Sequence, residues 1–171
     1  APETDALVWD ENGATSDSDA WWNDTAPTSS VFTVGTHDRV NADGKNFIAY
    51  VFAPKQGYSK FGGYRGNNNA DGPFVYLGFK PAYVIVKRTD SAASWIIFDS
   101  KRPGYNGTGH RVYANGVDPE DTDSGDSMDL LSNGFKMRGG SGSTNAIAPY
   151  VYMAFAENPF VSSTGVPATA R

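Results

Sequence analysis

The 171-residue sequence contains no cysteine and only two histidines, His37 and His110. Without cysteine the chain has no disulfide framework, no thiolate metal site and no cysteine nucleophile. Two histidines among turn residues make a metal site built on two or three imidazoles hard to assemble. The chain also lacks a Gly-x-Ser-x-Gly motif and a glycine-rich loop followed by a helix. Stability must therefore come from packing, and no familiar enzyme motif is present.

Charged residues and long apolar runs are also scarce. The chain has 14 Lys and Arg against 19 Asp and Glu, a net charge of −5, and no run of even three basic residues. Nucleic acid is therefore not an expected partner, because binding to phosphates needs a basic surface. The longest apolar run, residues 47–54, is far shorter than the ~18 residues that cross a bilayer. We expect no membrane insertion.

Glycine, proline and aromatic residues are abundant, with 19 Gly, 10 Pro, 10 Phe, 9 Tyr and 4 Trp. The aromatic content excludes disorder, and so many Gly and Pro residues argue against a helical bundle. Short segments alternate apolar and polar residues between regularly spaced turns, which is typical of antiparallel β structure. We predict an all-β fold, a two-sheet antiparallel β-sandwich of the jelly-roll or concanavalin-A-like kind, with helix in under a tenth of the residues. Residues 1–160 form its single domain, and residues 161–171 form a C-terminal tail.

Residues 47–53 and 150–156 are the expected central strands, since both are apolar on both alternating faces and match ring for ring. Residues 31–34 read as a further strand, and residues 58–64 alternate more loosely. Residues 73–77, 82–87 and 95–98 suggest a three-strand meander, and Asn133-Gly134 predicts a hairpin between residues 130–131 and 135–137. Helix is expected only as a turn or two around residues 126–131.

Residues 100–127 lose the strand pattern apart from residues 112–113, and a loop of this length is usually functional or mobile. Sugar recognition needs flat apolar rings beside amides and charged groups. The loop supplies this mixture with Tyr105, Asn106 and His110, and Trp21 and Trp22 form a second candidate patch. The alternative for the tryptophans is that they plug the end of the sandwich.

The acidic residues 118–126 are the other polar cluster of the sequence. Asp121, Asp123 and Asp126 could supply oxygen ligands to a calcium ion, and no other cofactor is expected. The spacing fails the EF-hand pattern, because Ser132 stands where a bidentate Glu is required. The alternative is a solvated acidic loop.

Glycoside hydrolysis would need two carboxylates at a fixed separation. Linear sequence cannot give that separation. The candidates are Asp99, Asp118, Asp121 and Glu157.

Several longer motifs resemble a known protein family. They are residues 25–32 (TAPTSSVF), 57–62 (GYSKFG), 70–82 (ADGPFVYLGFKPA), 86–90 (VKRTD), 95–99 (WIIFD), 131–136 (LSNGFK) and 152–160 (YMAFAENPF). Together they resemble the C-terminal domain of structural proteins of tailed-bacteriophage virions, of the tail-fibre type. The resemblance implies no catalytic residue, and residues 100–127 carry almost none of the shared motifs.

The resemblance implies a location on the virion surface and a role as a non-enzymatic tail or head fibre domain. The expected partners are a host cell-surface glycan or receptor, other virion proteins, and further copies of the chain in a homo-oligomer, most simply a trimer. Two alternatives stay open. The domain could be a glycan depolymerase of the glycoside hydrolase type, or a purely structural fibre cap.

Overall fold

The computed structural model describes residues 4–102, 106–107, 109–140 and 142–158. Its regular structure is mainly β, as predicted. The helices α1 (Asp19–Trp22) and α2 (Asp38–Asn41) have four residues each, and the 3-10 helix η1 (Ser124–Asp126) has three. No helix in the described part of the chain is long and apolar enough to span a membrane.

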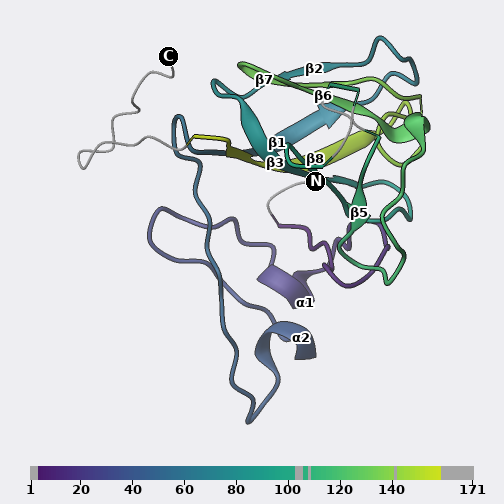
Figure 1. The fold of residues 1–171 in the computed structure, drawn as a ribbon. Coiled ribbons are helices and arrows are strands. Elements are labelled where there is room, and N and C mark those ends of the chain that lie inside the picture. The colour runs from purple at the N-terminus through teal and green to yellow at the C-terminus, as the bar shows by residue number, and fades with distance from the viewer. Residues whose placement is uncertain (1–3, 103–105, 108, 141, 159–171) are drawn as a thin grey trace.

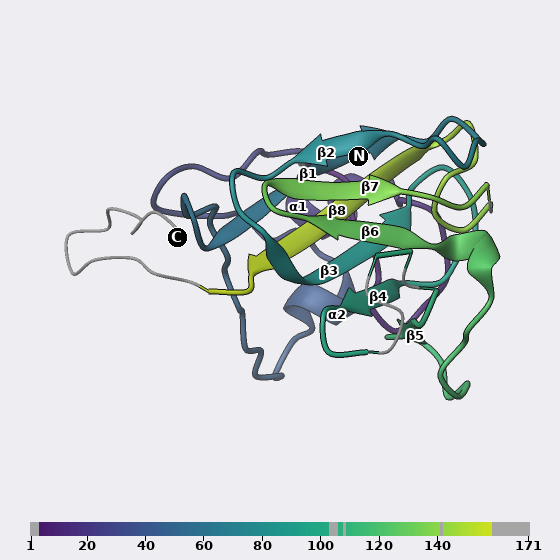
Figure 2. The same cartoon turned by 45° about the horizontal axis from the view of Figure 1, so that its top comes forward.

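Two antiparallel sheets face each other (Figures 1 and 2). The five-stranded sheet has the order β1 (Ser59–Arg65), β8 (Pro149–Ala156), β3 (Pro81–Arg88), β4 (Ile96–Asp99) and β5 (Val112–Tyr113). The three-stranded sheet has the order β2 (Phe74–Tyr76), β7 (Gly134–Met137) and β6 (Met128–Leu131). The all-β sandwich predicted from the sequence is therefore confirmed.

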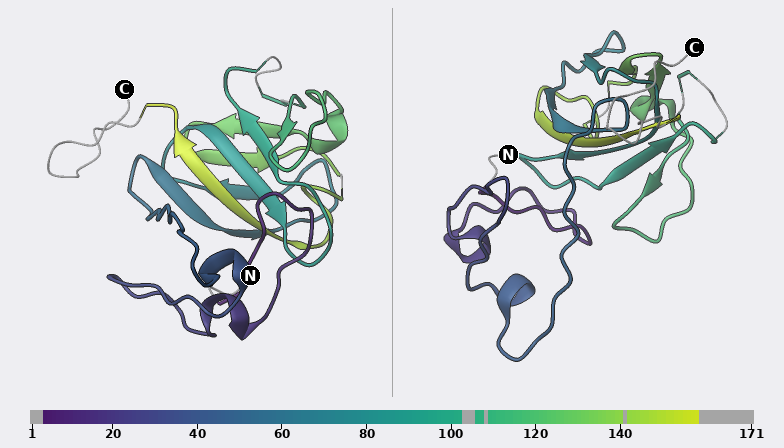
Figure 3. Two further views of the ribbon diagram at one scale, coloured as in Figure 1. Left: turned by 90° about the horizontal axis from the view of Figure 1, so that it is seen from below. Right: turned by 90° about the vertical axis from the view of Figure 1, so that its left-hand side faces the viewer.

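The core fills the space between the two sheets. Strands β3, β4 and β8 supply Val84, Phe98 and Ala154, and the smaller sheet supplies Phe135 and Met137; all five are fully buried. These positions alternate with less buried ones along β4 and β8, which is the period-two pattern of a strand with one core-facing side. The opposite face of the larger sheet is partly covered by residues 4–22, seen in purple beneath the sheet in Figure 3.

Several strand predictions are confirmed. Residues 150–156 lie in β8, which pairs with both β1 and β3 in the middle of the sheet. The hairpin around Asn133-Gly134 joins β6 to β7, with Leu131 opposite Gly134. Residues 112–113 form β5 at the sheet edge.

Other predictions were wrong. Residues 47–53 and 31–34 contain no strand, and residues 47–53 are exposed rather than central. Residues 73–77 do not begin a meander, because β2 joins the smaller sheet while β3 and β4 pair in the larger one. The expected helical turn at 126–131 is mostly strand β6. The predicted tail, residues 161–171, lies outside the described residues.

Candidate functional site

Residues 4–58 form an N-terminal arm below the larger sheet, carrying α1 and α2 (Figures 1 and 3). Its first part is fixed to the sheet by hydrogen bonds. The Thr15 amide donates to the Thr89 carbonyl at 2.9 Å, and the Trp95 indole donates to the Val8 carbonyl at 3.0 Å. Beyond Trp22 the arm leads away from the sheet, and it returns only where it joins β1.

Trp21 is a structural residue of this arm. Its side chain is buried, its indole Nε1 donates to Ser16 Oγ at 3.1 Å, and its ring stacks on His37 with centroids 3.8 Å apart. Gly35 fits tightly beside α1, where an added Cβ would lie 2.2 Å from the Ala20 carbonyl oxygen. Trp21 is therefore mostly enclosed by the arm, with 8% of its surface exposed. The sequence alternative of a packed tryptophan describes it better, although it packs the arm rather than the end of the sandwich.

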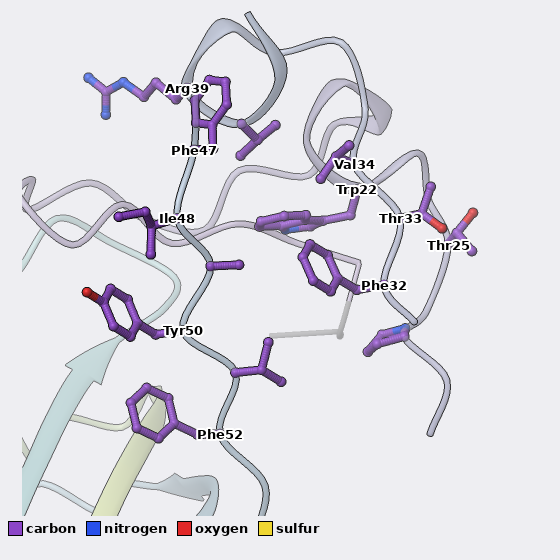
Figure 4. Close-up of a pocket in the computed structure, with 14 residues that line it drawn as sticks. Trp22, Thr25, Phe32, Thr33, Val34, Arg39, Phe47, Ile48, Tyr50 and Phe52 are labelled. Carbon is purple, nitrogen blue, oxygen red and sulfur yellow. The ribbon is translucent and has the colours of Figure 1, made fainter. Parts of the chain in front are cut away.

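Trp22 lines an open apolar hollow of about 680 Å³ (Figure 4). Its lining also includes Phe32, Phe47, Tyr50 and Phe52, which come from two separate stretches of the arm. The volume is within the range of ligand sites. The sequence points to Trp22 but not to its neighbours in the hollow, because residues 47–53 look like a buried strand.

The lining of the hollow is mostly apolar. Arg39 is the only ionisable side chain on its wall apart from the Tyr50 phenol, and no carboxylate or imidazole is among the lining residues. Arg39 also lines a second hollow of about 510 Å³ and pairs there with Glu11 at 2.5 Å and Asp10 at 3.8 Å. Neither hollow contains two carboxylates facing each other.

The loop from β4 to β5 is held by an ion-pair network. Glu120 lies between His110 and Arg102, with His110 Nδ1 2.7 Å from Glu120 Oε1. These two partners hold the pKa of the Glu120 carboxyl below its usual range. Asn106 is exposed with a left-handed φ of 55°, and its side-chain amide forms no hydrogen bond with the described residues. Tyr105 lies outside the described residues.

Arg111 contacts all three of the acidic residues that the sequence suggests as calcium ligands. Its guanidinium is buried, and Nη2 lies 2.7 Å from Asp121 Oδ2 and 3.3 Å from Asp126 Oδ2. Its Nη1 donates to the Asp123 carbonyl at 2.6 Å. The pKa of the Asp121 carboxyl is lowered mainly by its hydrogen bond with the Tyr113 hydroxyl. Among the described residues no group of three His, Cys, Asp or Glu side chains is arranged to hold a metal.

The carboxylates proposed for glycoside hydrolysis are mostly neutralised by cations. Asp99 pairs with Arg102 at 2.8 Å, Asp121 with Arg111 at 2.7 Å, and Glu157 with Lys80 at 2.8 Å. No hydrogen bond, ion pair or ring contact in the described structure joins Trp21 or Trp22 to Asn106 or His110.

Comparison with known proteins leaves the function open. No curated protein and no solved structure matches this chain. Residues 1–159 match the family described as "Domain of unknown function (DUF7483)". Because the match covers most of the sequence, the chain belongs to the DUF7483 family.

Proposed function

We propose that this chain is a non-enzymatic recognition domain on the surface of a tailed-phage particle, where it contacts a host cell-surface glycan. The supporting observation is that, between β4 and β5, described residues on both sides of Asn106 are held by ion pairs. Arg111 anchors this loop beside β5, and Glu120 ties His110 to Arg102. A binding loop ordered in advance loses less conformational entropy when its ligand binds.

The exposed chemistry of this loop fits a polar ligand. Asn106 carries both a hydrogen-bond donor and an acceptor, and neither is used within the described structure. An amide of this kind can pair with two sugar hydroxyls. The virion location is an expectation from the motif resemblance, and the loop is the part of the chain that carries almost none of the shared motifs. Variation there on a constant scaffold suits receptors that differ between hosts.

The ion pairs also favour binding over hydrolysis. A general acid needs a raised pKa near neutrality, whereas Glu120 and Asp121 have lowered pKa values because cationic or hydroxyl donors contact them. A depolymerase would need at least one carboxyl group with a raised pKa to act as the general acid.

A glycan array of bacterial surface polysaccharides tests the proposal, with the Asn106→Gly variant as the probe of the loop. Glycine keeps the left-handed backbone at φ 55° and removes only the amide. The matched control is Asn68→Gly, since Asn68 is also exposed, has φ 54° and makes no side-chain hydrogen bond in the described structure.

We expect Asn106→Gly to weaken binding about tenfold, the equivalent of one or two lost hydrogen bonds, and Asn68→Gly to bind as the parent does. Equal binding by both variants would refute the loop site. Absence of binding by the parent to every glycan and to host envelopes would favour the structural cap. Release of reducing ends from a bound polysaccharide would favour the depolymerase.

A further inference from the structure

Residues 46–53 have the sequence of a buried strand but lie in the open. Ile48 is 81% exposed, Tyr50 80% and Val51 77%. In Figure 1 this segment is the long trace that climbs from α2 to β1 without regular structure. In Figure 4, Ile48, Tyr50 and Phe52 point to one side of it, so it presents rings to solvent rather than to a core.

The backbone of this segment also lacks partners. Residues 46–52 form no backbone hydrogen bond with the described part of the chain. Strand β8 is similarly apolar, and there both edges are satisfied by β1 and β3. Residues 46–52 have no such neighbouring strands in the described structure.

The apolar surface is large enough for a stable protein interface. The bulky apolar residues of 31–34 and 47–52 are on average about three-fifths exposed. At roughly 150–250 Å² for each large side chain they offer on the order of 900 Å². A standard interface buries about 800 Å² on each partner. The patch continues onto the sheet, where the ring of Phe52 lies 6.1 Å from Phe61 and 6.3 Å from Phe155.

We propose that a second copy of this chain covers this surface, with residues 46–53 pairing as a strand with the neighbouring copy. The segment is self-complementary, since an unpaired strand offers another copy equal numbers of amides and carbonyls. Residues 25–36 and 46–54 contain no charged side chain. Two copies that each carry a net charge of −5 can therefore meet here without placing like charges in contact.

This inference goes beyond the host-surface proposal and does not depend on it. The pairing would bury Trp22 and its hollow in a subunit interface, while Asn106 lies outside the patch. Trp22 would then have an assembly role rather than a glycan-binding one. Assembly of a parent chain that binds no glycan would refute only the function proposed above.

Multi-angle light scattering with Ile48→Glu and Ile147→Glu tests the surface. Ile147 is 67% exposed on the β7–β8 loop, so both variants place the same charge on an exposed isoleucine. The parent and Ile147→Glu should both have the mass of an oligomer of 18.3 kDa chains. The resemblance predicts three chains, and a mass of two chains also fits the pairing. Ile48→Glu should raise the dissociation constant roughly a hundredfold, because a buried unpaired charge opposes association. A parent mass of one chain at every concentration would overturn the proposal, as would equal masses for the two variants.

Hydrogen exchange separates strand pairing from unspecific apolar contact. In a monomer the amides of residues 47–52 have no hydrogen-bond partner and should exchange at the unprotected rate. In the assembly we expect exchange slowed by on the order of tenfold or more, with protection lost in Ile48→Glu. Ala49→Pro removes one amide and should weaken association, whereas Ala49→Ser, which keeps it, should not. Unprotected amides in the assembled parent would overturn the pairing.

Discussion

Replacement of Arg111 by methionine is the strongest test of how the long loop is held. Arg111 is 2% exposed and its guanidinium contacts Asp121, Asp126 and the Asp123 carbonyl. Methionine fills much of the same volume but leaves Asp126, itself 5% exposed, without its cation. Removing one partner of a buried ion pair costs about 3–5 kcal/mol. We expect the lower end, about 3 kcal/mol, because the Asp121 side chain is 33% exposed and regains water.

For a domain of this size about 3 kcal/mol corresponds to a fall in Tm of roughly 6–12 °C, measured by calorimetry at pH 7. Arg102→Met is the matched control on the same loop. Its side chain is 29% exposed, so the loss should stay within about 1 kcal/mol. Adding Asp126→Asn to Arg111→Met removes the uncompensated charge and should recover part of the loss. A fall in Tm for Arg111→Met no larger than that for Arg102→Met would refute the reasoning.

Three further predictions concern the sandwich itself. Phe135→Ala empties a fully buried core position and should destabilise the domain by about 3–5 kcal/mol in urea titration; a loss under 1 kcal/mol would show that the sheets do not pack as described. Asn145→Ala removes donors to the Gly139 and Asn69 carbonyls at 2.7 and 2.8 Å, so we expect a loss of about 2–3 kcal/mol and faster proteolysis within residues 66–72, with unchanged cleavage as the contrary result. Burial raises the pKa of the Tyr64 hydroxyl well above 10.0. Since the unfolded chain releases this proton near pH 10 and the folded chain does not, stability should fall as the pH rises above about 10; a Tyr64→Phe variant with the same alkaline unfolding curve would exclude this cause.

The sequence was a good guide wherever a local pattern decides the structure. Residues 150–156 alternate toward a core, and Asn133-Gly134 closes a two-strand hairpin, and both were predicted correctly. It was a poor guide to pairing, because side-chain alternation does not say which strands meet. The turn at Gly78 leads from β2 in one sheet to β3 in the other, and nothing in the local pattern distinguishes such a crossing from a hairpin.

The candidate site shows the same limit. Nothing in the sequence marks Arg111 as buried, because a buried arginine and an exposed one look identical in a sequence. Residues 118–126 suggested a metal site because no basic residue lies among them in the sequence. Their cation is Arg111, which forms an isolated β-bridge with Asp121. Residues 47–53 were predicted to form a central strand because apolar side chains of this kind are usually buried. In the structure these side chains are exposed.

The position of β8 has a consequence for how the chain folds. The last strand of the described chain lies between β1 and β3, so residue 59 pairs with residue 155. Until residues 149–156 emerge from the ribosome, β1 has no neighbour and the larger sheet is split. Contacts across such a long stretch of chain are slow to form, because the loop between them must close first. The nascent domain should therefore stay unfolded until residues 149–156 have been synthesised, and a chain cut before residue 149 should aggregate rather than fold.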